Sequence, residues 1–159
     1  MSSRHDAYIG LGANLGARKQ SIHRALDAID DLPQVELVDV SNMYETNACF
    51  VEEQPDFINA CAHLKTSLSA LGLLQQLLAI EQSMGRVRDV HQGPRVIDLD
   101  LLFYADQIID EEGLSVPHPD LHNRDFVLRP MVDIAPEVVH PVLQKSVKQI
   151  WDERRKRRA

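Results

Sequence analysis

The sequence predicts an α+β protein, a single domain in which a mainly antiparallel sheet is covered by helices. Apolar and polar residues alternate with period two through residues 96–104 and again through 57–66, which is typical of half-buried strands. Between them, leucines at helical spacing from Leu71 to Met84 indicate a helix that ends near Gly85. A chain of 159 residues with 44% hydrophobic and 26% charged residues is large enough to bury its own core.

The first part of the chain predicts a strand, a helix and a second strand. The strand at 7–12 runs into the glycine-rich turn 12–16, which lacks the spacing of a phosphate-binding loop. Apolar residues at helical spacing follow until Pro33, and residues 35–44 predict the second strand. Residues 45–55 show no period, and a connection of that length is typically either functional or disordered.

The last third of the chain predicts shorter elements. Residues 105–106 predict a turn into a brief extended segment, and two prolines fix residues 115–120 in an extended conformation. A short helix around Val127 and a final helix over roughly 146–155 complete the chain.

Charge is unevenly distributed along this acidic chain. Its net charge is −7, yet five of the 17 basic residues lie in 154–158. The rest of the chain therefore has 12 basic and 24 acidic residues. We expect such a body to repel nucleic acid, and the tail 154–159 to be a solvated helix end or a disordered extension. No apolar run approaches a membrane span, and Cys49 and Cys61 form no zinc spacing. We therefore expect a cytoplasmic protein without a membrane or nucleic-acid partner. We also expect a monomer, although none of these features bears on oligomeric state.

Two carboxylates share one face of the strand at 96–104. Asp98 and Asp100 are separated by one residue, which places their backbones roughly 7 Å apart on that face. The core face would carry Ile97, Leu99, Leu101 and Phe103, and the aspartate face Val96, Leu102 and Tyr104. Like charges on an apolar strand are costly unless a cation lies between them, and oxygen ligands suit Mg²⁺ or Mn²⁺. The alternative is an edge strand whose aspartates are solvated or paired with arginine.

Basic residues accompany this pair in the sequence. Arg86, Arg88 and Arg95 bracket the preceding loop, and such mixed charge predicts a site for a metal–polyphosphate complex, or else a surface ion-pair cluster. His118 could bind phosphate, transfer a proton or simply lie on the surface. Asn59, in the middle of a strand, is either a structural amide or a ligand-reading one.

Several motifs resemble those of the 6-hydroxymethyl-7,8-dihydropterin pyrophosphokinases (HPPK), enzymes of folate biosynthesis. The segment 91–102, H-x-G-P-R-x-x-D-L-D-L-L, matches their signature, and A-Y-I-G-L-G-A-N-L-G, Q-P-D-F-I-N-A, G-R-V-R, V-P-H-P-D and N-R-D-F follow the family's order over nearly the whole chain. The resemblance implies a ferredoxin-like fold and transfer of pyrophosphate from ATP to the hydroxymethyl group of the dihydropterin, releasing AMP. It also implies that residues 46–55 and 86–92 close over the bound substrates.

The resemblance further implies roles for individual residues. Two Mg²⁺ ions would be held by Asp98 and Asp100, which act in catalysis together with Arg86 and Arg95. The ATP site would comprise Glu81, Arg88, Leu101, Ser115, His118 and Arg124. The pterin site would comprise Thr46, Phe57, Asn59 and Phe126, with the phenyl rings stacking on the pterin and Asn59 reading its edge.

The chain departs from the family pattern at three positions. Gln92 replaces an aromatic residue, often Trp, of many members, and Asp89 and His122 stand where several members carry lysine. Aromatic stacking contributes about 1–3 kcal/mol, so closure of the loop is weakened unless Phe50 supplies the ring. The alternatives are another metal-dependent phosphohydrolase or nucleotidyltransferase, and a catalytically weakened nucleotide-binding module.

Overall fold

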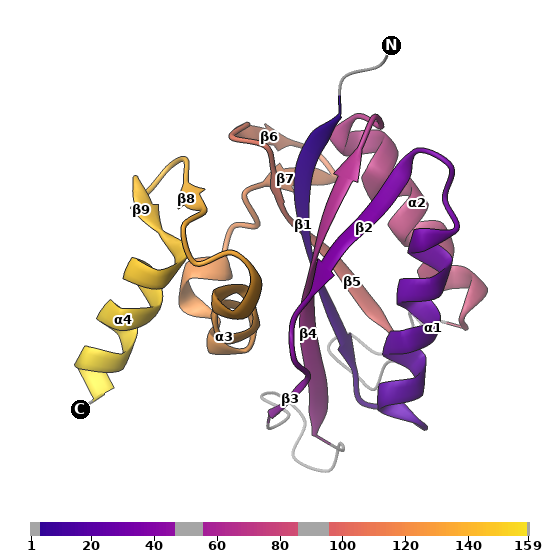
Figure 1. Cartoon of the computed structure of the whole chain (residues 1–159), viewed down its shortest axis with the longest axis horizontal. Helices are drawn as coiled ribbons and strands as arrows, with labels where there is room; N and C mark the ends of the chain where they lie inside the picture. The colour runs from indigo at the N-terminus through magenta and orange to yellow at the C-terminus, as the bar shows by residue number, and fades with distance from the viewer. Residues whose placement is uncertain (1–3, 47–55, 86–95, 159) are drawn as a thin grey trace.

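The computed structural model describes residues 4–46, 56–85 and 96–158, which form an antiparallel sheet with helices on both faces (Figure 1). The strands are β1 (His5–Ala13), β2 (Val35–Val40), β3 (Tyr44–Thr46), β4 (Phe57–Thr66), β5 (Asp98–Tyr104), β6 (Ile109–Glu111), β7 (Leu114–Val116), β8 (Val139–His140) and β9 (Lys145–Ser146). The helices are α1 (Arg18–Asp30), α2 (Ala70–Ser83), α3 (Asp125–Ile134) and α4 (Val147–Arg158), with a 3₁₀ turn, η1 (Leu121–Asn123).

The main sheet has the strand order β2-β4-β1-β5. β3 pairs with the first residues of β4, whereas β2 pairs with its last ones. Every pairing in the sheet is antiparallel. The succession β1-α1-β2-β4-α2-β5 with this order is the split βαβ arrangement of ferredoxin-like folds. The predicted α+β class and mainly antiparallel sheet are therefore confirmed. The two-stranded pairs β6-β7 and β8-β9 lie outside the main sheet.

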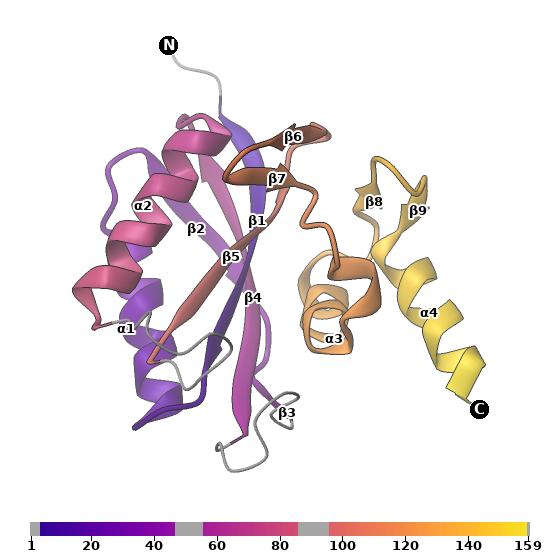
Figure 2. The ribbon, with the colours of Figure 1, turned by 180° about the vertical axis from the view of Figure 1, so that it is seen from behind.

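Helices α1 and α2 cover one face of the sheet (Figure 2). Their buried apolar residues recur at spacings of three and four: Ile22, Ala25, Leu26 and Ile29 on α1, and Ala70, Leu73, Leu77 and Ile80 on α2. This spacing places them on one side of each helix, facing the core. Helix α2 begins where Ser69 Oγ accepts a hydrogen bond from the Gly72 N–H at 3.0 Å.

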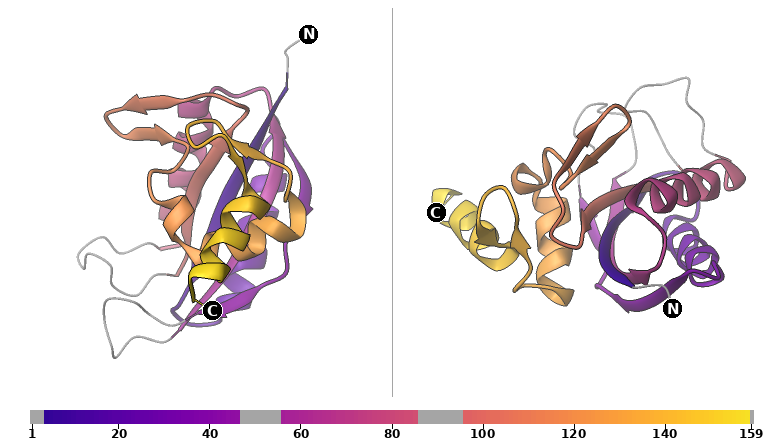
Figure 3. Two further views of the ribbon diagram at one scale, coloured as in Figure 1. Left: turned by 90° about the vertical axis from the view of Figure 1, so that its left-hand side faces the viewer. Right: turned by 90° about the horizontal axis from the view of Figure 1, so that it is seen from above.

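Helix α3 covers the opposite face of the sheet, and α4 packs on the outer side of α3 (Figure 3). A second core lies here, with Leu102 and Phe103 from β5 against Leu128 and Met131 from α3. The predicted faces of β4 are also observed, because Leu64 points to the first core and Cys61 to the second.

A β-bulge changes which residues of β5 face each core. Tyr8 pairs with Phe103 and Ile9 with Leu101, so Leu102 is the additional residue. An additional residue inverts the side-chain alternation beyond it. The prediction that Phe103 lies on the core face of Leu99 and Leu101, with Tyr104 opposite, is therefore wrong: Phe103 packs in the α3 core and Tyr104 in the α1–α2 core.

Other element boundaries differ modestly from the prediction. The second predicted strand is divided, because β2 ends at Val40 and β3 begins at Tyr44. Helix α4 continues to Arg158, beyond the predicted Arg155. The predicted closing segments fall almost entirely outside the described residues. Among the residues that are described, no helix is long and apolar enough to span a membrane.

Candidate active site

A row of residues crosses the α3 face of the sheet from the Asp pair to Asn59. Asp98 of β5 is paired with Gly12 of β1, and Gly12 is paired with Asn59 of β4. Directly opposed residues of antiparallel strands share a face, so Asp98 and Asn59 lie on the same side with only a glycine between them. Asp100 lies in the next such row, beside Gly10, and precedes the bulge, so both carboxylates keep their predicted common face.

Glu81 fixes the backbone between the two aspartates. It is 1% exposed on α2, and its Oε2 accepts a hydrogen bond from the Leu99 N–H at 2.6 Å. Because Leu99 lies between Asp98 and Asp100 in β5, this hydrogen bond fixes the backbone position from which both carboxylates project. The role predicted for Glu81 in the ATP site stays a prediction, and this contact adds a positioning role that the sequence pattern did not reveal.

His118 is held beside β5 by its backbone. Its N–H donates to the Leu102 carbonyl at 2.9 Å, and its Nδ1 accepts from the Asp120 N–H at 3.3 Å. Burial lowers the pKa of His118, as does Arg124, whereas Asp120 and Asp98 raise it. A neutral ring that accepts at Nδ1 carries its proton on Nε2, which can donate to a phosphate oxygen.

Arg124 and Phe126 lie together at the start of α3. The guanidinium carbon of Arg124 is 5.6 Å from the centre of the Phe126 ring, within cation–π range. Arg124 Nη2 is also 3.9 Å from a carboxylate oxygen of Asp120. A residue predicted for the ATP site and one predicted for the pterin site are thus neighbours.

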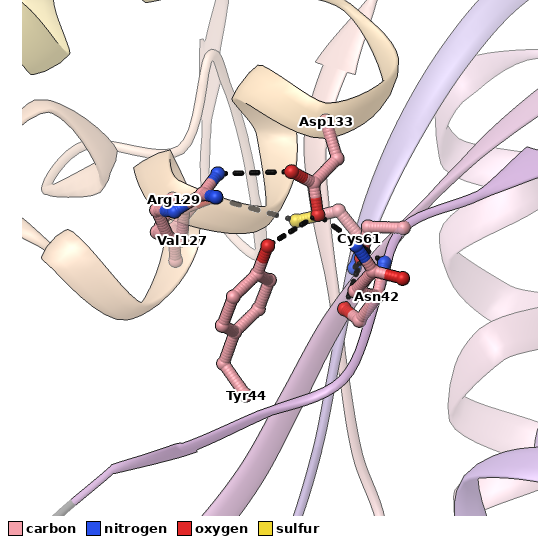
Figure 4. Close-up of polar contacts among 7 residues, drawn as sticks. Asn42, Tyr44, Cys61, Val127, Arg129 and Asp133 are labelled. Atoms are coloured by element: carbon pink, nitrogen blue, oxygen red, sulfur yellow. Dashed lines mark hydrogen bonds and ion pairs between the residues drawn. The ribbon is translucent and has the colours of Figure 1, made fainter.

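A polar network joins α3 to the strand that carries Thr46 (Figure 4). The Tyr44 hydroxyl donates to Asp133 Oδ2 at 2.7 Å, Arg129 donates to Oδ1 at 2.9 Å, and the Asn42 N–H donates to Oδ2 at 3.2 Å. The hydrogen bond from Tyr44 to Asp133 raises the pKa of the tyrosine. Sequence reasoning missed this network. The spacing of Arg129 and Asp133 by four residues in a helix was the one available signal.

The remaining predicted residues are placed as follows. Leu101 packs its side chain in the α1–α2 core, 5% exposed, so only its backbone is available to a ligand. Ser115 is paired with Asp110 in the β6-β7 ribbon. Thr46 is paired with Phe57 at the end of β3. The predicted Arg86, Arg88 and Arg95, and the divergent Gln92 and Asp89, lie outside the described residues.

The donor set of this face fits magnesium better than zinc. Among the described residues no three His, Cys, Asp or Glu side chains gather into a metal-binding group. Mg²⁺ commonly takes only one or two protein carboxylates and completes its shell with water and phosphate oxygens. Asp98 and Asp100 match that requirement.

A family model matches residues 8–136, and its description is 7,8-dihydro-6-hydroxymethylpterin-pyrophosphokinase (HPPK). The chain belongs to this family. A Haemophilus influenzae protein named 2-amino-4-hydroxy-6-hydroxymethyldihydropteridine pyrophosphokinase is 43% identical over 149 residues, covering 92% of this chain and 93% of the relative. A Pseudomonas aeruginosa protein of the same name is 44% identical over 134 residues, covering 84% of this chain and 83% of the relative. The resemblance stated from the motifs is confirmed, and the chain is a pyrophosphokinase.

Longer proteins contain the same unit. The folic acid synthesis protein fol1 of Schizosaccharomyces pombe is 36% identical over 146 residues. The match covers 92% of this chain but only 20% of the relative. A crystal structure of Plasmodium falciparum HPPK-DHPS superposes with a TM-score of 0.79 at 16% identity, covering 99% of this chain and 44% of that one. At that identity the likeness supports the fold alone.

Proposed function

We propose that this pyrophosphokinase transfers a pyrophosphoryl group from ATP to the hydroxymethyl group of 6-hydroxymethyl-7,8-dihydropterin in the cytoplasm, acting as a monomer. The observation that carries the proposal is the row from Asp98 across Gly12 to Asn59, in which a carboxylate and an amide lie on one face of the sheet. The carboxylate would bind the cation, and the amide would read the edge of the pterin. In the reaction, the hydroxyl oxygen bonds to the β-phosphorus of ATP. The bond from that phosphorus to the oxygen of AMP breaks, and the hydroxyl proton is released.

The carboxylate pair would hold the metal. Asp98 and Asp100 are the ligands for two Mg²⁺ ions, which when bound supply charge neutralisation on the triphosphate. Arg86 and Arg95, from the segment that precedes β5, add positive charge around the transferring group. Catalysis then rests mainly on positioning and charge, with no side chain assigned as a general base.

The ATP site would be built beside this pair. His118 donates from Nε2 to a phosphate oxygen, and Arg124 supplies a fork of donors for others. Ser115, Arg88 and the backbone at Leu101 complete the site. Glu81 holds β5 through its hydrogen bond with the Leu99 N–H.

The pterin site would lie at the other end of the row. Asn59 would read the edge of the heterocycle with its amide, while the Phe57 and Phe126 rings provide stacking faces. Thr46, paired with Phe57, bounds the site at the end of β3. The polar network of Tyr44 and Asp133 keeps this end of the sheet close to α3.

The test is pterin-dependent formation of AMP. With ATP, Mg²⁺ and hydroxymethyl-dihydropterin, the wild type should release AMP, and Asp98→Asn or Asp100→Asn should lower the rate by about 100-fold or more with the fold retained by circular dichroism. Asp106→Asn, at an exposed carboxylate in the turn after β5, is the matched control and should keep the wild-type rate. Release of ADP without pterin would instead indicate a phosphohydrolase.

A further inference from the structure

Gly12 occupies a strand position at which the backbone does not require glycine. It lies inside β1, and its φ is outside the left-handed region that glycine alone adopts readily. Glycine inside a strand destabilises it relative to alanine, because glycine loses more conformational freedom on folding. Such a glycine often marks a place where another group approaches the backbone closely.

The group that approaches is the amide of Asn59. A methyl group on Gly12 would lie 3.0 Å from Asn59 Oδ1 and 3.7 Å from Cδ1 of Phe57. The first distance is too short for an undisturbed contact, so either the amide or the strand would have to shift. Asn59 is 7% exposed, which leaves its side chain little room to move away.

Gly10, two residues earlier on the same face, has no such neighbour. The atoms nearest to a methyl group there would belong to the Leu102 side chain, at 3.7 Å, which is an ordinary van der Waals distance. The two glycines therefore share strand, face and residue type, but differ in what the missing side chain makes room for.

We propose that Gly12 is a positioning residue for the pterin, because its missing side chain allows the Asn59 amide to lie over β1 in the orientation that reads the heterocycle. This inference rests on the pterin site proposed above. A pterin edge carries donors and acceptors in a fixed order, so a displacement of the amide weakens its hydrogen bonds to the pterin, and a rotation of the amide can break them. The specificity of the site is then set partly by a residue without a side chain.

The test compares Gly12→Ala with Gly10→Ala. KM for pterin and for ATP, kcat, and the Kd of 6-hydroxymethylpterin measured by its fluorescence are determined for each variant. Gly12→Ala should raise the pterin Kd and KM about 10-fold while the ATP KM stays within about twofold. Gly10→Ala should leave all four values within about twofold. Equal behaviour of the two variants in an active enzyme would overturn the inference and leave the proposed reaction standing.

A double-mutant cycle tests whether Gly12 acts through Asn59. In an Asn59→Ala background the clashing oxygen is gone, so Gly12→Ala should change the pterin Kd by less than about twofold. An additive effect would overturn the inference. If Gly12→Ala alone fails to fold but the double variant folds, the contact with Asn59 is the cause and the inference is supported. If both fail to fold, strand packing alone explains the glycine and the inference is wrong. A wild type that makes no AMP with pterin would refute the proposed function itself.

Discussion

Replacing Glu81 by alanine should destabilise the protein, because the replacement removes the acceptor of a buried backbone N–H. The Leu99 N–H would lose its acceptor at a buried position, since Glu81 is 1% and Leu99 4% exposed. A buried donor left without a partner costs about 1–3 kcal/mol. Taking about 2 kcal/mol, the melting temperature of a chain of this size should fall by roughly 4–8 °C.

The matched variants separate the hydrogen bond from other effects. Glu81→Gln keeps a carbonyl oxygen of the same reach, so it should lose less stability than Glu81→Ala. Gln82→Ala changes an exposed neighbour on α2 and should be nearly neutral. Equilibrium urea unfolding, followed by circular dichroism without nucleotide, measures all three. If the free energy of unfolding of Glu81→Ala lies within about 0.5 kcal/mol of the wild-type value, the bond to Leu99 does not stabilise β5.

Two further predictions concern parts of the fold away from the carboxylates. Tyr44→Phe removes one donor from Asp133 and should lower the free energy of unfolding in urea by about 0.5–1.5 kcal/mol. Asp133→Ala removes the acceptor of three donors and should lower it further. Equal losses in the two variants would contradict the network. Burial lowers the pKa of His140, as does His122, and its Nδ1 accepts two backbone N–H groups at 3.2 and 3.1 Å. A lowered folded-state pKa means that this contribution to stability is present above about pH 6.5 and is lost as the pH falls through the folded-state pKa. Unfolding free energies measured from pH 7.5 to 5 should therefore decline less in His140→Gln than in the wild type, and identical slopes would be inconsistent with this role.

Local patterns predicted the elements and the carboxylate pair because both depend on short-range periodicity. The alternation through β4 assigned Asn59 and Cys61 to one face, and the period-two pattern placed Asp98 and Asp100 together. The family motifs then identified the enzyme, as the matched model over residues 8–136 confirms.

What the sequence could not predict depends on pairing between distant segments. The bulge at Leu102 follows from the register of β5 against β1, and nothing within β5 indicates it. The bond from Glu81 to Leu99 joins residues 18 positions apart. The bond from Tyr44 to Asp133 spans 89. Such contacts form only once the helices pack on the sheet, so the local periodicity of the sequence does not predict them.

The number of cations that Asp98 and Asp100 hold next to nucleotide tests most directly whether these carboxylates bind the metal. Mn²⁺ binding, followed by electron paramagnetic resonance with α,β-methylene-ATP, should give about two ions per chain for the wild type. Asp98→Asn and Asp100→Asn should each lose at least one ion or bind about 10-fold more weakly, while Asp106→Asn should match the wild type. Unchanged Mn²⁺ number and affinity in both site variants would contradict the claim that these carboxylates hold the metal.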